Sequence, residues 1–234
     1  MSEAFDKVRG VRELPVFPLP LVLFPGVPLP LHIFEERYRR MLSDVRASNN
    51  LFGLSYFVPD FSTEDRPPTG HIGCATEVIE AQSLPDGRSN ILTLGVVRYR
   101  ITEYVERGEP YLVARVEFFE DEESDPQVLL KRADEVTEMF MRIARAMRTA
   151  NDERGSLPEL PKDDPERLSF LIAAVVEMDA EAKQQLLEIR STAERLRRLY
   201  TLLAEAVSSY EGRARTHELA RGNGHAGKKI DFEE

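Results

Sequence analysis

The chain has 234 residues, of which 42% are hydrophobic and 31% charged, and its formal net charge is −10. This composition is typical of a globular protein with enough apolar residues for one large core or two small ones, and it excludes a disordered chain. The acidic balance argues against a general nucleic-acid binder, because such proteins neutralise phosphates with Lys and Arg.

The N-terminal residues contain no apolar signal-peptide core, and no run of about 18 uncharged apolar residues occurs in the sequence. Cys74 is the single cysteine, so it cannot form an internal disulfide. It lies in a segment of alternating apolar residues, where we expect a buried structural thiol rather than a nucleophile. These features predict a cytoplasmic protein without a membrane span.

The stretch from Leu14 to Arg40 is rich in proline and aliphatic residues. Its prolines are Pro15, Pro18, Pro20, Pro25, Pro28 and Pro30. Proline at this density excludes a helix and a central strand, because each ring removes a backbone donor and restricts φ. We therefore predict short extended pieces that are broken at Phe24-Pro25-Gly26, with Gly26 at a positive φ.

The pattern then becomes helical. Apolar residues recur at spacings of three and four, as on one face of a helix. They are Phe34, Tyr38, Met41, Leu42 and Val45. We expect both Phe24 and Phe34 to lie in the core.

Four later segments alternate or cluster apolar residues as strands do. They are Leu51–Val58, His71–Leu84, Ser89–Thr102 and Tyr111–Phe119. Pro85-Asp86-Gly87-Arg88 joins two of them as a hairpin turn. Pro59–Gly70 is a polar loop. The first ~120 residues therefore predict a small barrel or curled sheet with one helix.

An acidic run followed by Pro126 marks a boundary, after which the periodicity is helical. Asp179 is placed to cap a short helix, and Ser191-Thr192-Ala193-Glu194 has the pattern of a capping box. The cluster Arg190, Arg195, Arg197 and Arg198 is interleaved with glutamates, which predicts a solvated helix face. The predicted organisation is a flexible arm (1–11), a β-rich lobe (12–120), a helical lobe (126–210) and a disordered tail (211–234).

The block LPVFPLPLVLFPGVPLPLHIFEERYRR resembles the opening of the Lon protease N-terminal domain, also called the LON substrate-binding domain. The similarity continues at Asp164–Leu168, Lys183–Glu188 and Glu194–Leu196, so it spans roughly residues 12–210. It implies an α+β fold with a β-rich lobe similar to PUA-type barrels, followed by a helical lobe. Because no ATPase or protease module follows, the chain looks like a stand-alone form of this domain.

No catalytic motif is evident. The segment from Gly222 to Lys229 matches the P-loop pattern except at its last position, where Lys229 replaces Ser or Thr, and no strand pattern precedes it. The four histidines form no zinc-binding motif. We therefore expect no catalytic residues, no cofactor and no metal.

The resemblance implies a non-catalytic protein that binds unfolded or apolar polypeptide segments in connection with proteolysis or quality control. Tyr56, Phe57 and Phe61 are the candidate binding residues, and Phe61 lies in a polar loop where burial is not forced. Because neighbours on a strand alternate faces, either Tyr56 or Phe57 should belong to the core.

Three alternatives stay open. The chain is a small-ligand-binding protein or an uncharacterised enzyme that uses a groove between the lobes, or it is an RNA-binding PUA-like module. Self-association into a homo-oligomer is compatible with each of these functions. Neither a nucleic acid nor a membrane is expected as a partner.

Overall fold

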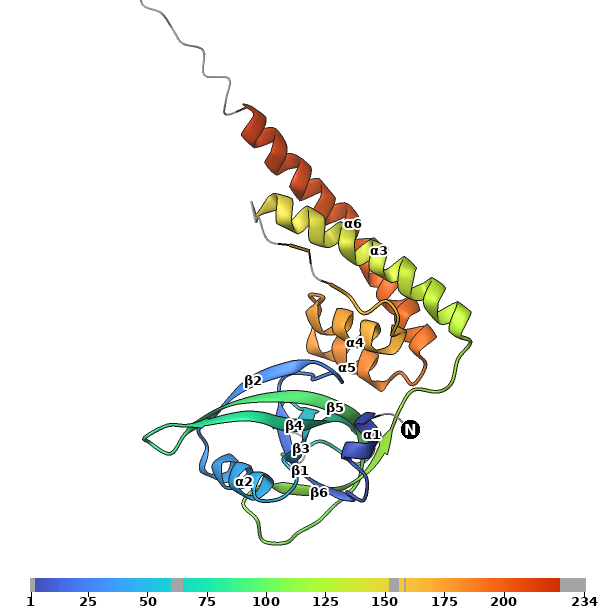
Figure 1. Cartoon of the computed structure of the whole chain (residues 1–234). Helices are drawn as coiled ribbons and strands as arrows, with labels where there is room; N and C mark the ends of the chain where they lie inside the picture. The colour runs from blue at the N-terminus through green and yellow to red at the C-terminus, as the bar shows by residue number, and fades with distance from the viewer. Residues whose placement is uncertain (1–2, 60–64, 152–155, 158, 224–234) are drawn as a thin grey trace, which may run out of the picture. The chain divides into compact units, whose positions relative to one another are not determined.

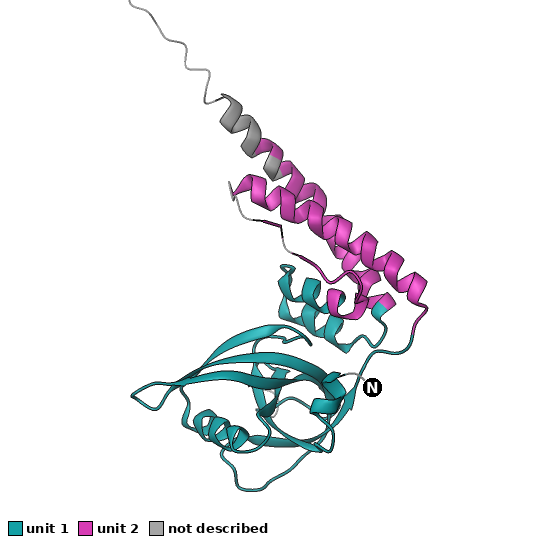
Figure 2. Ribbon diagram, viewed as in Figure 1, with its two compact units in different colours: residues 1–123, 169–192 teal, residues 124–168, 193–234 magenta. Residues whose placement is uncertain are grey.

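The computed structural model of the chain describes residues 3–59, 65–151, 156–157 and 159–223. The chain folds as two compact units, which Figure 2 colours separately. The first unit comprises Met1–Glu123 and Ser169–Thr192, and the second comprises Ser124–Leu168 and Ala193–Glu234. The first break lies close to the predicted end of the β-rich lobe at residue 120, but the segment 169–192, which the prediction placed in the helical lobe 126–210, groups with the β-rich part.

The described strands of the first unit form one six-stranded sheet, with the order β2-β5-β4-β3-β1-β6 (Figure 1). Their bounds are β1 Glu13–Leu19, β2 Pro28–Ile33, β3 Leu51–Tyr56, β4 Ile72–Ser83, β5 Ser89–Tyr104 and β6 Leu112–Phe119. An additional pairing of β5 with β6 curls the sheet back on itself. The pairing of β1 with β3 is parallel, and all the others are antiparallel. The predicted α+β class with a curled β-rich lobe is confirmed.

The proline-rich block forms two strands that are separated where the sequence predicted. The prediction that its prolines exclude a central strand is wrong for β1, which lies between β3 and β6; each neighbour pairs with a different half of the strand, so the missing N–H groups interrupt neither ladder completely. Gly26 adopts a φ of 74°, and its N–H donates to the carbonyl of Gly95 over 2.9 Å. Phe24 is fully buried, as expected. The turn between β4 and β5 also follows the prediction, with Gly87 at a φ of 80°.

Helix α2 (Glu36–Arg46) buries the predicted apolar face. Its buried residues are Tyr38, Met41, Leu42 and Val45. They share a core cluster with Phe17 and Phe52 of the sheet. The prediction that Phe34 belongs to this core is wrong: its side chain is 60% exposed, because the helix begins only at Glu36.

The N-terminal residues are more ordered than the predicted arm 1–11. Residues Glu3–Lys7 form the short helix α1, and Val8 after it is only 2% exposed. Val8 packs in a cluster with Leu14 and Tyr99 of the sheet. Its burial explains why this segment folds onto the sheet, since a valine withdrawn from water stabilises the docked segment by about 1.5 kcal/mol or more.

The remaining helices are α3 Pro126–Ala150, α4 Pro165–Val175, α5 Ala180–Glu188 and α6 Thr192–Asn223. The side chain of Asp125 caps α3 by accepting from the Gln127 N–H, and that of Asp179 caps α5 by accepting from the Ala182 N–H. No helix in these ranges combines the length and the apolar character that a membrane span requires.

Two predictions about the last helix differ from the structure. Helix α6 continues beyond Gly212 to Asn223, whereas the sequence predicted a disordered tail over 211–234. Residues 213–221 contain good helix formers, and extending an existing helix avoids the cost of nucleation. Arg195 is fully buried rather than solvated, although Arg197 and Arg198 do form exposed ion pairs with Glu194.

Candidate functional site

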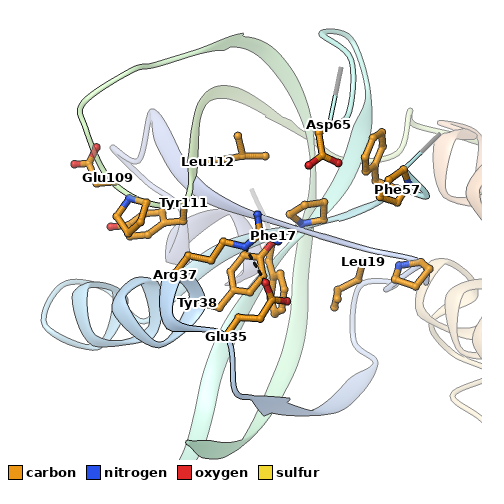
Figure 3. Close-up of a pocket in the computed structure, with 14 residues that line it drawn as sticks. Phe17, Leu19, Glu35, Arg37, Tyr38, Phe57, Asp65, Glu109, Tyr111 and Leu112 are labelled. Carbon is orange, nitrogen blue, oxygen red and sulfur yellow. Dashed lines mark hydrogen bonds and ion pairs between the residues drawn. The ribbon is translucent and has the colours of Figure 1, made fainter. Parts of the chain in front are cut away.

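The candidate site is a pocket of about 380 Å³ beside the second half of β1, within the first unit (Figure 3). Most of its lining is aromatic, aliphatic or proline. The lining residues are Phe17, Pro18, Leu19, Pro20, Glu35, Arg37, Tyr38, Phe57, Pro59, Asp65, Glu109, Pro110, Tyr111 and Leu112. They come from segments that lie far apart in the sequence and that the curled sheet brings together.

The pocket lies where β1 loses one of its two neighbours. Strand β1 pairs with β6 only from Glu13 to Val16, and Val16 is opposite Leu112, the first residue of β6. From Val16 to Leu19 it continues to pair with β3. The edge of β1 beyond Val16 is therefore without a strand partner in the described part of the sheet.

Pro18 occupies the free position of this edge, and Pro20 follows the end of the strand. The Leu19 carbonyl accepts from the Phe57 N–H over 2.9 Å, so Leu19 directs its backbone groups toward the β3 side. Backbone groups alternate sides along a strand, and Pro18 therefore directs its carbonyl toward the open edge. Pro18 and the following Pro20 have no N–H, so these two positions offer acceptors and no donors.

The floor of the pocket is formed by the rings of Phe17 and Tyr38, with Phe52 buried behind them and outside the lining. The centroids of Phe17 and Tyr38 are 4.0 Å apart with a tilt of 37° between the rings, and Phe52 lies 6.2 Å from Phe17. The Arg37 guanidinium lies over the Tyr38 ring, with its carbon 4.6 Å from the centroid, and its Nε donates to Glu35 over 3.0 Å. Burial raises the pKa of Tyr38, so its hydroxyl stays neutral.

One wall is tied to α2 by a hydrogen bond. The Tyr111 hydroxyl donates to Asp44 over 2.9 Å, and Asp44 also accepts from Arg40 over 2.9 Å. Burial, together with the Asp44 carboxylate, raises the pKa of Tyr111 to about 12. This hydroxyl is therefore a fixed structural group, and its ring presents an apolar face to the pocket (Figure 3).

The three residues predicted from the sequence have different outcomes. Phe57 follows β3 and lines the pocket. Both Phe57 and Tyr56 are half-buried, so the prediction that one of them belongs to the core is wrong: β3 ends at Tyr56, and the alternation of strand faces does not extend to Phe57. Tyr56 is not part of the lining. Its hydroxyl donates to Glu181 of α5, and this hydrogen bond is the main reason why the pKa of Tyr56 is raised to about 12. Phe61 lies outside the described residues, although Pro59 and Asp65 on either side of it in the sequence line the pocket.

Several lining residues were not predicted. Phe17, Tyr38, Tyr111 and Leu112 were assigned to strands or a helix from their own neighbours in the sequence, and no local signal shows that they meet. The one usable signal was Pro18 near the end of β1, since proline within a strand indicates an edge position without a partner.

Other features of the described residues do not form a comparable site. They contain no group of three or more His, Cys, Asp and Glu side chains placed to hold a metal ion. Cys74 is fully buried, and burial raises the pKa of its thiol to about 12, which confirms a structural thiol. Lys228 and Lys229 of the P-loop-like segment lie outside the described residues. A pocket of about 660 Å³ in the second unit has a largely charged lining, which includes Asp134, Arg145 and Lys162.

The sequence matches a known family over most of its length. Residues 13–205 match the family described as the ATP-dependent protease La (LON) substrate-binding domain. The chain is 27% identical to Lon protease 2 of Herpetosiphon aurantiacus over 201 residues, which cover 85% of this chain and 24% of that protein. It is 26% identical to the Lon protease of Escherichia coli K12 over 202 residues, which cover 83% of this chain and 25% of that protein. The chain thus spans about a quarter of the length of these relatives.

Two solved structures share the fold. A Lon N-terminal domain protein from Xanthomonas campestris superposes with a TM-score of 0.59 at 22% identity. The N-terminal domain of the Mycobacterium avium complex Lon protease superposes with a TM-score of 0.64 at 17% identity. Each match covers 82% of this chain and 98% of the other. With the family match over residues 13–205, these likenesses show that the chain belongs to the family of Lon substrate-binding domains.

Proposed function

We propose that the chain binds extended apolar segments of unfolded polypeptide at the pocket beside β1, as a binding step in Lon-related proteolysis. The observation that carries this proposal is the open edge of β1 above an aromatic floor. The family description, a substrate-binding domain, supports the same reading.

The geometry suits recognition without a strict sequence requirement. An extended segment can donate its backbone N–H groups to the edge carbonyls of β1, as peptides do when they add to a sheet edge. Its apolar side chains would then lie on the rings of Phe17, Tyr38 and Tyr111. Aromatic rings give a large contact area at a low cost in side-chain entropy, so they can accept many apolar partners.

Phe57 provides the most direct test, since it is the one predicted residue that lines the pocket in the described structure. A fluorescently labelled unfolded protein is titrated with the wild-type chain and with Phe57→Ala. We expect the variant to bind about tenfold more weakly, the usual effect of removing an aromatic anchor. Thermal unfolding of both proteins checks that the fold is retained.

Phe34→Ala is the matched control. Phe34 is another phenylalanine of the first unit; it is 60% exposed, whereas Phe57 is half-buried, and it does not line the pocket. Its removal should leave the affinity within about twofold. Equal binding by the wild type and Phe57→Ala contradicts the proposed site, and failure of all three proteins to bind contradicts the proposed function.

The same titration tests the roles predicted for Tyr56 and Phe61 with one variant at each position. Phe61→Ala should weaken binding about tenfold with little effect on stability, as for a loop aromatic that anchors a ligand. Tyr56→Phe removes only the hydroxyl that bonds to Glu181 and keeps the ring, so it should leave the affinity within about twofold. Binding of RNA in place of unfolded protein would favour the RNA-binding alternative.

A further inference from the structure

The pocket beside β1 presents hydrogen-bond acceptors and negative charge around an apolar floor. We propose that it selects polypeptide segments in which a Lys or Arg side chain lies next to an apolar one. This inference rests on the proposed function, and it names the class of segment that the pocket prefers. Three features of the pocket carry it: the charges at its opening, the backbone of its edge, and the stacking of Arg37 on its floor.

The charged lining is mainly acidic. Glu35, Asp65 and Glu109 contribute three carboxylates, and Arg37 is the single cation among the described lining residues. The Arg37 guanidinium forms an ion pair with Glu35, so the charge of one of the three carboxylates is balanced within the pocket. Neither Asp65 nor Glu109 forms an ion pair with any residue in the described ranges. Figure 3 shows these two carboxylates on opposite sides of Leu112.

The backbone adds acceptors of the same kind. Pro18 leaves the open edge of β1 without a donor, and Pro20, which follows the strand and also lines the pocket, has no N–H either, while the carbonyls of both remain. The Tyr111 hydroxyl does not compensate, because it already donates to Asp44. Lys and Arg side chains carry only donors, so they complement this edge better than a carboxylate or an uncharged acceptor does.

The aromatic floor can pack against the apolar stem of a Lys or Arg side chain. Lys and Arg have apolar stems that lie along apolar surfaces while the charged head reaches polar groups. Arg37 already does this within the pocket, since its guanidinium lies 4.6 Å above the Tyr38 ring and bonds to Glu35. A second cation from a bound segment could stack on the neighbouring rings and reach Asp65 or Glu109.

The overall charge of −10 would by itself favour basic ligands, so the test must separate the pocket from the rest of the surface. The pocket variant is Asp65→Asn combined with Glu109→Gln. The matched control is Glu80→Gln combined with Glu117→Gln, which removes two exposed carboxylates outside the lining and changes the net charge equally.

The probes are three labelled peptides with the same apolar-aromatic core, flanked by lysines, by glutamates or by serines, and binding is measured by fluorescence anisotropy at constant salt. We expect the lysine peptide to bind the wild type about tenfold more tightly than the glutamate peptide, with the serine peptide between them. The pocket variant should reduce this difference to about twofold, and the control variant should retain most of it.

The outcomes distinguish this inference from the proposed function. Equal binding of all three peptides to the wild type overturns the charge preference and leaves polypeptide binding in place. An equal loss of preference in the pocket and control variants also overturns it, because the effect would then come from the overall charge. Failure of every peptide to bind overturns both proposals.

Discussion

Arg98 of β5 and Asp121, which follows β6, form an ion pair whose side chains are 1% and 4% exposed. The other guanidinium nitrogen of Arg98 donates to the carbonyls of Leu187 and Ile189, over 3.2 and 2.6 Å. The Thr192 hydroxyl donates to the second oxygen of Asp121. A buried charge is tolerated only when its partners are complete, so this network fixes the segment after α5 against the sheet of the first unit.

Asp121→Ala should therefore lower the free energy of unfolding by about 3–5 kcal/mol, since it leaves the Arg98 charge buried without its carboxylate. Urea unfolding measures this loss. Glu194→Ala is the comparison, because Glu194 makes exposed pairs with Arg197 and Arg198 that should contribute about 1 kcal/mol or less. Similar losses in the two variants would contradict a structural role for the buried pair.

Gly53→Ala should destabilise the first unit by about 1–3 kcal/mol, the usual cost of overpacking a core. A Cβ atom at Gly53 would lie 2.5 Å from the hydroxyl oxygen of Tyr99, which is fully buried and bonds to Ser55 over 2.8 Å. Gly212→Ala serves as the control: nothing lies within 4 Å of its added Cβ, and it should leave stability unchanged or raise it. Thermal unfolding compares the two variants.

Stability should decline as the pH falls below about 6.5, in part because of His71. Burial lowers the pKa of His71 despite the opposing charge of Glu188, and its Nε2 is buried without a hydrogen-bond partner among the described residues. The unfolded chain then binds a proton at a higher pH than the folded chain, so acid favours unfolding. His71→Gln should show a smaller loss between about pH 7.5 and about pH 5 in denaturant titrations. An unchanged slope would show that other groups cause the decline.

Cys74 should be unreactive toward a thiol reagent in the folded protein and react fully once guanidinium chloride unfolds it. The thiol is fully buried, and its pKa is raised to about 12 by that burial. Both effects suppress the reactive thiolate at neutral pH. Rapid labelling under native conditions, with the fold intact by circular dichroism, would contradict the buried position of Cys74.

Local patterns in the sequence predicted most of the secondary structure. The prolines and Gly26 placed the break between β1 and β2, the spacing of Tyr38, Met41 and Val45 placed the buried face of α2, and Asp179 caps α5 as expected. Each of these signals depends on neighbours within one or two turns of the chain, where the sequence period maps directly onto geometry.

The failed predictions concern tertiary partners. Phe34 has the spacing of a core residue but precedes the helix, and Arg195 has the composition of a solvated face but is fully buried. The pocket depends on the meeting of β1, α2 and the segment before β6, and no local period encodes that meeting. Phe57 was a candidate because it is an aromatic residue at the end of the predicted strand Leu51–Val58, whereas Tyr111 and Tyr38 carried no comparable signal.

The interruption of the first unit by residues 124–168 has a consequence for synthesis on the ribosome. Strand β5 emerges early, but the carbonyls of Leu187 and Ile189 that receive Arg98 are made about ninety residues later. The guanidinium of Arg98 therefore lacks these two hydrogen-bond acceptors until the whole intervening helical segment has been synthesised. During this interval the chain exposes incompletely packed apolar surface, which makes such an intermediate prone to aggregation. Nascent chains that stop before Thr192 should therefore remain sensitive to protease, and those that extend well beyond it should become resistant.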